Sequence, residues 1–208
     1  MEHPEPDKRT LRRRFLSVRN RCTEDDVRAA AEVVARQALD LPELAAAGTV
    51  AAYVSVGSEP GTGPLLDALY ARGVRVLLPV LLPDNDLDWA PYEGPGSLVP
   101  VRRPGLMELL EPAGGRLGPA AVLAADAVLL PGLAVDAHGT RLGRGGGSYD
   151  RVLARLAAAG TGPALVVLLY DAEVVERLPA EAHDRPVDAV VTPGGVHRFP
   201  EARRRPPR

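Results

Sequence analysis

The sequence predicts a three-layer α/β/α fold, in which a mostly parallel sheet lies between two layers of helices in a single domain. Short apolar runs, which suit strands buried on both faces, alternate with helical patterns; the runs are 49–54, 74–82, 126–132, 164–169 and 187–193. The chain has 208 residues, 46% of them hydrophobic, which suffices for one core. We place the domain at 1–198 and expect a disordered tail at 199–208, which lacks apolar periodicity.

Two helices are expected at the start of the chain, within 8–39. In the first, apolar residues recur at i, i+4, i+7 and i+11 and form one stripe, made of Leu11, Phe15, Val18 and Cys22. The second begins at Thr23, whose hydroxyl can cap the helix while Asp26 reaches back to it.

The later elements continue the alternation of strands and helices. Further helices are expected at 64–73, at 148–160 and, in a shorter form, around 171–178. Residues 83–119 are rich in Pro and Gly, so we expect long loops there with one edge strand at 87–92. Ligands of parallel sheets bind beyond the carboxyl ends of the strands. The loops after 49–54, 126–132 and 164–169 should therefore share one edge and carry the chemistry.

Composition excludes several classes of protein. Cys22 is the only cysteine, so the chain cannot form an internal disulfide. No apolar stretch reaches the roughly 20 residues that a membrane span needs, and the Met1 end lacks the apolar core of a signal peptide. We therefore expect a cytoplasmic protein without a membrane partner, and a monomer.

The stretch RLGRGGGSYDR at 141–151 places a glycine run between a strand and a helix. Such a loop directs backbone N–H groups and the positive end of the helix dipole at one point, which suits a phosphate group. Arg141 and Arg144 add positive charge. The loop matches neither the dinucleotide-binding nor the Walker pattern, and glycines that only serve a turn are the plain alternative. The pattern is consistent with a nucleotide held without a Walker P-loop.

Three acidic residues near this edge are candidates for chemistry. Asp150 lies in the first turn of the helix after the glycine run, where it can hold Mg²⁺ beside phosphate oxygens or simply start the helix. Asp184, next to His183 in a loop before the last strand, is its candidate partner in a metal pair. Glu59 follows the first strand and can recognise a polar heterocycle or orient a reacting nitrogen. Each acid by itself also fits an ordinary loop residue.

The first helix is strongly basic, although the chain has a net charge of -2. Three interpretations are open: a solvated face, an arm for nucleic acid or an anionic surface, and a rim of cations that point into a cleft. The third rests on the helical wheel, on which Lys8, Arg12 and Arg19 lie within about 40° of each other beside the apolar stripe. Arg9 and Arg13 face outward on the same wheel.

Several motifs, in one order, resemble the 5-formyltetrahydrofolate cyclo-ligase family, also called 5,10-methenyltetrahydrofolate synthetases. The most specific is LLPGLAVDAHGTRLGRGGGSYDR. It is accompanied by KRTLRRR at the start, YVSVGSEPGTGPLL after the first strand, LLEP at 109–112 and HDRPVDAVVTP near the end. Together these motifs cover most of the chain, and their order and spacing are more specific than any one of them.

The resemblance implies an enzyme that cyclises 5-formyltetrahydrofolate to 5,10-methenyltetrahydrofolate with ATP and Mg²⁺, releasing ADP and phosphate. It implies that the N5-formyl oxygen is phosphorylated, that N10 attacks the activated carbon, and that phosphate then leaves. The residues it implies for ATP are Lys8, Arg12, Arg141, Gly143, Arg144, Gly145, Gly146 and Gly147. It also implies that Asp150 and Asp184 hold the metal and that Glu59 and Tyr149 face the folate. Glu59, Arg144 and Tyr149 are therefore the candidate catalytic residues.

The chain departs from the family pattern at two points. Many members have an aromatic residue where this chain has Ser148, so we expect Tyr149, with Trp89 as a second candidate, to supply stacking surface for folate. Many also have a Gln near 171–173, where this chain has none. Two other functions remain open. One is an inert relative that binds RNA through the basic helix; nucleic acid is the less favoured partner, because the site residues are intact. The other is a phosphotransferase that acts on another small molecule.

Overall fold

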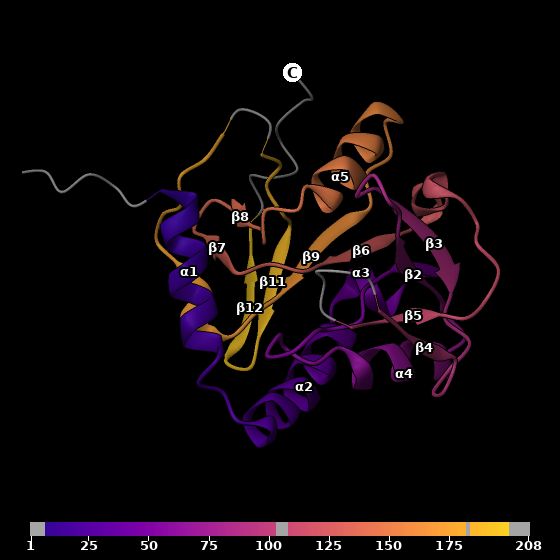
Figure 1. Cartoon of the computed structure of the whole chain (residues 1–208), viewed down its shortest axis with the longest axis horizontal. Coiled ribbons are helices and arrows are strands. Elements are labelled where there is room, and N and C mark those ends of the chain that lie inside the picture. The colour runs from indigo at the N-terminus through magenta and orange to yellow at the C-terminus, as the bar shows by residue number, and fades with distance from the viewer. Residues whose placement is uncertain (1–6, 103–107, 182–183, 200–208) are drawn as a thin grey trace, which may run out of the picture.

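The computed structural model describes residues 7–102, 108–181 and 184–199. Its main sheet has seven strands: β1 (Thr49–Ala51), β2 (Arg75–Leu81), β3 (Leu87–Pro91), β6 (Ala127–Leu130), β9 (Ala164–Leu168), β11 (Ala189–Thr192) and β12 (Gly195–Arg198). Their order across the sheet is β12-β11-β9-β6-β1-β2-β3 (Figure 1). The five inner strands pair in parallel, and the edge strands β3 and β12 pair antiparallel. The predicted class, α/β with a mostly parallel sheet, is confirmed.

Helices cover both faces of this sheet (Figure 1). One face carries α2 (Glu24–Leu39), α3 (Pro42–Ala45) and α4 (Gly63–Ala71), and the other carries α5 (Ser148–Ala158) and the 3-10 helix η1 (Pro119–Ala124). Successive strand residues point to opposite faces. In β1, Val50 packs with the first set of helices and Ala51 with the second. The result is the expected three layers.

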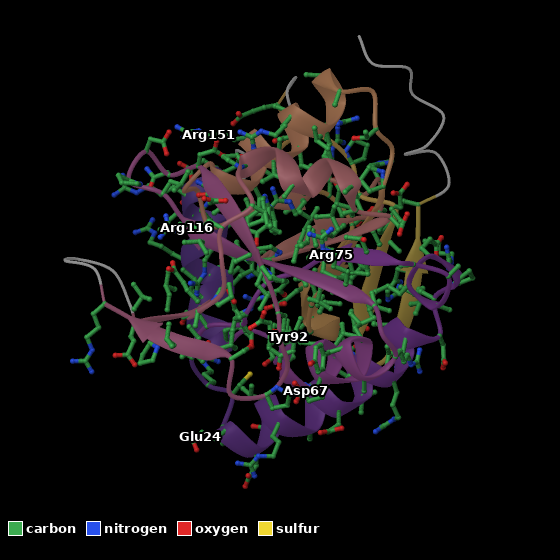
Figure 2. The ribbon with its side chains drawn as sticks, turned by 90° about the vertical axis from the view of Figure 1, so that its right-hand side faces the viewer. Glu24, Asp67, Arg75, Tyr92, Arg116 and Arg151 are labelled. Carbon is green, nitrogen blue, oxygen red and sulfur yellow. The ribbon has the colours of Figure 1, made fainter. Side chains whose placement is uncertain are left out.

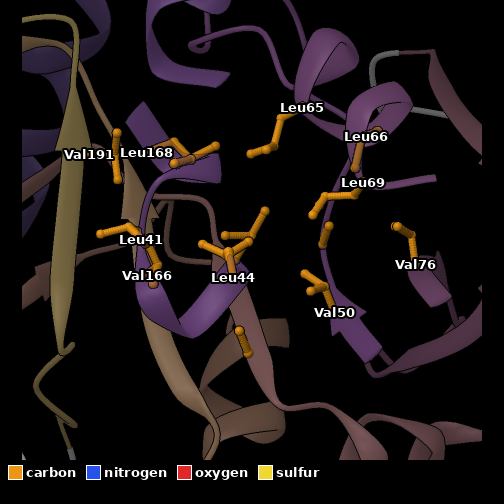
Figure 3. Close-up of a cluster of buried hydrophobic side chains, with 14 of the residues drawn as sticks. Leu41, Leu44, Val50, Leu65, Leu66, Leu69, Val76, Val166, Leu168 and Val191 are labelled. Carbon is orange, nitrogen blue, oxygen red and sulfur yellow. The ribbon is translucent and has the colours of Figure 1, made fainter. Parts of the chain in front are cut away.

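The core beneath α2, α3 and α4 explains a helix that the sequence did not predict. In Figure 3, Leu41 and Leu44 lie close to Val166 and Leu168 of β9. Leu44 is 1% exposed, and truncating such a side chain costs about 2–5 kcal/mol. The four-residue helix α3 is therefore held by burial, and it is too short to give a periodic signal.

The edge strand β3 agrees with the prediction of a strand at 87–92. Just beyond it, the Tyr92 hydroxyl donates a hydrogen bond to the Asp67 carboxylate of α4, and Figure 2 shows the two side chains together. Tyr70 of α4 meets the Tyr92 ring edge-on, with 5.9 Å between the ring centroids. The edge of the sheet is therefore tied to the helix that covers it.

The first two helices begin where the sequence predicted. α1 (Lys8–Arg19) is followed by α2, whose start is closed by Thr23 and Asp26: each accepts a hydrogen bond from the other's backbone N–H. The predicted apolar stripe is wrong at Val18, which is 42% exposed. The helix buries Leu11, Phe15 and, in the next inward position, Arg19 instead.

The expectation of long loops at 83–119 is wrong in its second half. β4 (Leu98–Val101) and β5 (Leu109–Pro112) pair antiparallel as a two-stranded ribbon, and η1 follows. Glu111 accepts a hydrogen bond from the Leu81 N–H at 3.2 Å, which ties the ribbon to β2. Such a ribbon depends on this contact with the domain, because two strands are marginally stable alone.

The helix expected at 171–178 is also wrong. A short 3-10 turn, η2 (Asp171–Glu173), leads into β10 (Val174–Val175). This strand joins β7 (Ala134–Asp136) and β8 (Arg141–Leu142) in a small sheet of order β10-β7-β8. The two β-branched residues pair with β7, a partner about 40 residues earlier in the chain, so local sequence does not show it.

The last described residue belongs to the core. Phe199, which the sequence places in the tail, is 8% exposed, and its N–H donates to the Asp188 carbonyl at 2.9 Å. The rest of the expected tail, 200–208, lies outside the described residues.

Candidate active site

A pocket of about 290 Å³ lies at the carboxyl edge of the sheet. Loops after β1 and β6, the ends of β2 and β5, and the glycine loop 143–147 line it. The prediction that the loops after the first and third apolar runs share one edge is confirmed. The pocket collects most of the predicted site residues: Glu59, Arg141, Gly143, Arg144, Gly145, Gly146, Gly147, Tyr149 and Asp150.

The glycine loop reaches this edge through the β7–β8 hairpin. The hairpin turns the chain back, and the Leu133 N–H donates to the Leu142 carbonyl at 2.7 Å, so that the loop begins beside the end of β6. Gly145 and Gly147 have φ of +95° and +76°, a region that favours glycine. Gly147 is the N-cap of α5. The loop thus leads directly into the positive end of a helix dipole.

Arg141 is the buried cation of the pocket, with 7% of its side chain exposed. Its guanidinium donates to the Pro131 carbonyl and to Asp150 Oδ1, each at 3.0 Å. Burial lowers the pKa of Arg141, and Asp150 offsets part of that effect. Because a guanidinium stays protonated in proteins, the pocket keeps a fixed positive charge at its wall.

Glu59 is a buried carboxylate on the opposite loop, with 7% of its side chain exposed. It accepts a hydrogen bond from the Val56 N–H at 2.9 Å and lies 3.4 Å from Arg144 Nε. Burial, with the charge of Glu59, raises the pKa of Tyr149 and of Tyr53. Both phenols therefore remain protonated near neutral pH and can donate a hydrogen bond.

Arg12 of α1 contacts the glycine loop, and Lys8 of the same helix contacts the segment that carries Glu181 and Asp184. Arg12 Nε donates to the Gly143 carbonyl at 2.9 Å, and Lys8 Nζ lies 2.8 Å from Asp184 Oδ2 and 3.2 Å from Glu181 Oε1. Burial lowers the pKa of Lys8, but its hydrogen bonds to the two carboxylates outweigh burial and raise it. Both side chains therefore face the protein, as the wheel predicted, but neither lines this pocket or the adjoining second pocket.

The proposed metal residues Asp150 and Asp184 line a second pocket of about 270 Å³, which shares Arg141 and Asp150 with the first. Each carboxylate is paired with a cation, Asp150 with Arg141 and Asp184 with Lys8. Among the residues that the structure describes, no group of three or more His, Cys, Asp or Glu side chains is placed to hold a metal ion. His183 lies outside those residues.

Two sequence expectations about the site are wrong. Trp89 is 0% exposed and packs in the core beside α5, so it offers no stacking surface to a ligand. Arg19 points into the protein, where it pairs with Glu173, and not into a cleft. The inward orientation of Lys8, Arg12 and Arg19 removes three cations from the surface that the RNA-binding alternative requires.

The pocket also contains residues that sequence reasoning missed. Tyr53 follows β1 at the carboxyl edge, a position that the sheet rule could have identified. Glu111 lines the pocket from β5 and is 5% exposed. It lies in the LLEP motif, but an isolated acid in an apolar strand gives no signal of its role.

The parallel sheet is covered by helices on both faces, and a ligand-sized pocket lies at its carboxyl edge. A glycine loop and buried charged groups form this pocket. These are the features of an α/β enzyme that acts on a small molecule. The chain belongs to the 5-formyltetrahydrofolate cyclo-ligase family, whose sequence model matches residues 4–193. It is thereby a ligase of folate one-carbon metabolism. In the part of the chain that the structure describes, no helix is both long and apolar enough to cross a membrane.

Curated relatives and a solved structure agree with this assignment. A 5-formyltetrahydrofolate cyclo-ligase of Mycolicibacterium smegmatis is 43% identical over 150 residues, which are 70% of this chain and 73% of that protein. One from Escherichia coli is 36% identical over 164 residues, 78% of this chain and 87% of that protein. The NMR structure of Aquifex aeolicus 5,10-methenyltetrahydrofolate synthetase has a TM-score of 0.75 and 31% identity and covers 93% of both chains.

Proposed function

We propose that this enzyme cyclises 5-formyltetrahydrofolate to 5,10-methenyltetrahydrofolate in a reaction that consumes ATP, requires Mg²⁺ and releases ADP and phosphate. One observation carries the proposal: the glycine loop and the Glu59–Arg144 pair face the same pocket. Groups suited to a phosphate and groups suited to a polar heterocycle thus lie within reach of one another. A phosphorylated intermediate needs that arrangement, because the phosphoryl donor and acceptor must meet in line.

The proposed reaction has two steps. First, the N5-formyl oxygen attacks the γ-phosphorus of ATP, the bond from that phosphorus to the β,γ-bridging oxygen breaks, and ADP leaves. Second, the N10 lone pair attacks the formyl carbon, the carbon–oxygen bond breaks, and phosphate leaves with that oxygen. N10 loses its proton, and the N5–CH–N10 bridge of the methenyl product remains.

The protein's contribution is to position the reactants and to neutralise charge. Arg141 and Arg144, with N–H groups of the glycine loop, would hold the phosphates, and Lys8 and Arg12 would support them from α1. Glu59 would orient the folate nitrogen that reacts. Tyr149, protonated because its pKa is raised, would donate a hydrogen bond to the folate or cover its ring.

Two carboxylates of the second pocket, which also contains Arg141, Arg151 and Arg185, would hold Mg²⁺. Asp150 and Asp184 supply carboxylate oxygens from the walls of one pocket. Mg²⁺ typically takes one or two protein carboxylates and completes its shell with phosphate oxygens and water. When bound, the ion would neutralise phosphate charge. The partners that the two carboxylates have here, Arg141 and Lys8, are also cations that can bind phosphate.

The proposal includes the setting of the enzyme. We propose a cytoplasmic protein, in keeping with its single cysteine, that acts as a monomer on two small-molecule substrates.

The test is the absorbance of the methenyl product, which is a chromophore distinct from the substrate. Purified protein, Mg-ATP and 5-formyltetrahydrofolate should generate it, and omission of ATP should abolish it. Excess EDTA should stop the reaction and added Mg²⁺ should restore it. Absence of product in the complete mixture would refute the activity, whereas undiminished turnover in EDTA would refute only the metal assignment.

A further inference from the structure

Arg19 and Glu173 form a buried ion pair that the proposed reaction does not use. Their side chains are 1% and 2% exposed. Arg19 Nε and Nη2 donate to the two oxygens of Glu173, at 2.5 and 2.8 Å. Buried pairs of this kind are weak evidence for stability, because apolar residues of similar volume often replace them without loss. The pair therefore calls for an explanation other than stability.

The contacts of the pair bring together three segments at the carboxyl edge. Arg19 Nη2 also donates to the Gly132 carbonyl after β6, at 2.7 Å. Glu173, which follows β9, also accepts from the Tyr170 N–H at 3.0 Å. The Tyr170 ring lies 5.9 Å from the Arg19 guanidinium, and its hydroxyl donates to the Ser58 carbonyl at 3.2 Å. One buried cation thus connects α1 with the loops after β6 and β9 and, through Tyr170, with the loop that holds Glu59.

Arg19 shares a helix face with the two residues proposed to support ATP. It follows Arg12 by seven residues and Lys8 by eleven, which are about two and three helical turns. On this face each cation makes a contact outside α1: Lys8 with Asp184, Arg12 with Gly143 and Arg19 with Glu173. Leu11 and Phe15 of α1 also pack in a small apolar cluster with Leu133, Ala134, Leu142 and Leu178. The polar contacts of Lys8, Arg12 and Arg19 therefore act together with this packing to place α1.

We propose that Arg19, paired with Glu173, is a positioning residue that sets α1 at the distance from the glycine loop at which Lys8 and Arg12 reach ATP. This inference rests on the proposed function. It also assigns a role to the loop in which many family members have a Gln. Here that loop supplies Glu173, and the partner of Glu173 is Arg19 of α1.

The test removes both charges at once. Arg19→Met/Glu173→Gln leaves no buried unpaired charge, and the Gln oxygen keeps an acceptor for the Tyr170 N–H. In calorimetric titration we expect the ATP dissociation constant of this variant to rise about tenfold, while that for 5-formyltetrahydrofolate stays within about twofold. The matched control is Arg198→Met/Glu43→Gln, which removes a two-bond Arg–Glu pair of 2.7 and 3.0 Å that lines neither pocket. It should leave both constants unchanged.

A double-mutant cycle separates positioning from general destabilisation. Arg12→Ala should weaken ATP binding several-fold less in the charge-free background than in the wild type, because Arg12 is already displaced there. Arg19→Lys keeps the charge but loses the bidentate geometry, so its ATP dissociation constant should fall between those of the wild type and the double variant. Unchanged ATP affinity in the double variant, equal losses for both ligands, or fully additive effects with Arg12→Ala would each overturn the inference. A wild-type protein that binds no ATP would instead refute the proposed function.

Discussion

Alanine substitutions in the glycine loop test whether its backbone conformation holds Arg12 for the nucleotide. Gly145 and Gly147 have φ of +95° and +76°, whereas Gly146 has no positive φ of this kind. A Cβ atom at Gly145 would lie 3.2 Å from Arg12 Cζ, but one at Gly146 or Gly147 meets no atom within 4 Å. Gly147→Ala therefore adds backbone strain alone, Gly145→Ala adds strain and a contact with Arg12, and Gly146→Ala adds neither.

The expected magnitudes follow from these two effects. A residue with a Cβ in the left-handed region costs roughly 1–2 kcal/mol, so Gly145→Ala and Gly147→Ala should each lower the free energy of unfolding by about that amount. Gly146→Ala should change it by less than about 0.5 kcal/mol. In Gly145→Ala the Arg12 guanidinium must also shift, which weakens its 2.9 Å bond to the Gly143 carbonyl. We expect a five- to tenfold higher ATP dissociation constant, or about 1–1.4 kcal/mol.

Urea unfolding and calorimetric titration with ATP measure the two quantities on the same three variants. Gly147→Ala should raise the ATP dissociation constant less than Gly145→Ala, because its Cβ contacts no protein atom. The reasoning is refuted if Gly145→Ala binds ATP as tightly as the wild type. It is also refuted if Gly146→Ala destabilises the protein as much as the other two, since strain would then not depend on φ.

Three further predictions concern single side chains. Asp150→Asn should keep the fold, because Asn also suits a helix start, and should lose most activity in the product-absorbance assay; near-normal turnover would make Asp150 a simple helix-start residue. Lys8→Ala should weaken ATP binding much more than Arg13→Ala, which removes the same charge from the exposed face of α1. Equal ATP dissociation constants for the two variants would indicate a diffuse basic surface. Ser148→Tyr should tighten folate binding up to about tenfold, and Tyr149→Ala should weaken it, while both variants keep the ATP affinity of the wild type. If calorimetry shows unchanged folate affinity in Tyr149→Ala, this stretch does not line the folate site.

The parts that sequence predicted well are those that short-range patterns specify. Continuous apolar runs identified the five inner strands of the main sheet but not the edge strand β12. The pair of Thr23 and Asp26 marked the start of α2, because a capping box involves residues only three positions apart. The set of residues around the glycine loop was predicted for a related reason. Strands of a parallel sheet end at one edge, so the loops that follow them meet there.

Tertiary structure alone decided the features that join distant segments. Val18 and Arg19 are adjacent on α1, and the hydrophobic pattern favoured burying Val18, yet the buried residue is Arg19. Its partner Glu173 is 154 residues away, and no local rule weighs a carboxylate at that distance. The same applies to β10, which forms a strand because β7 offers it a partner, and to Trp89, whose burial depends on how η1 and α5 close over the sheet. Local periodicity thus determined the long helices and the inner strands, whereas the short elements and the direction in which particular side chains point were settled by contacts that exist only after the elements have packed.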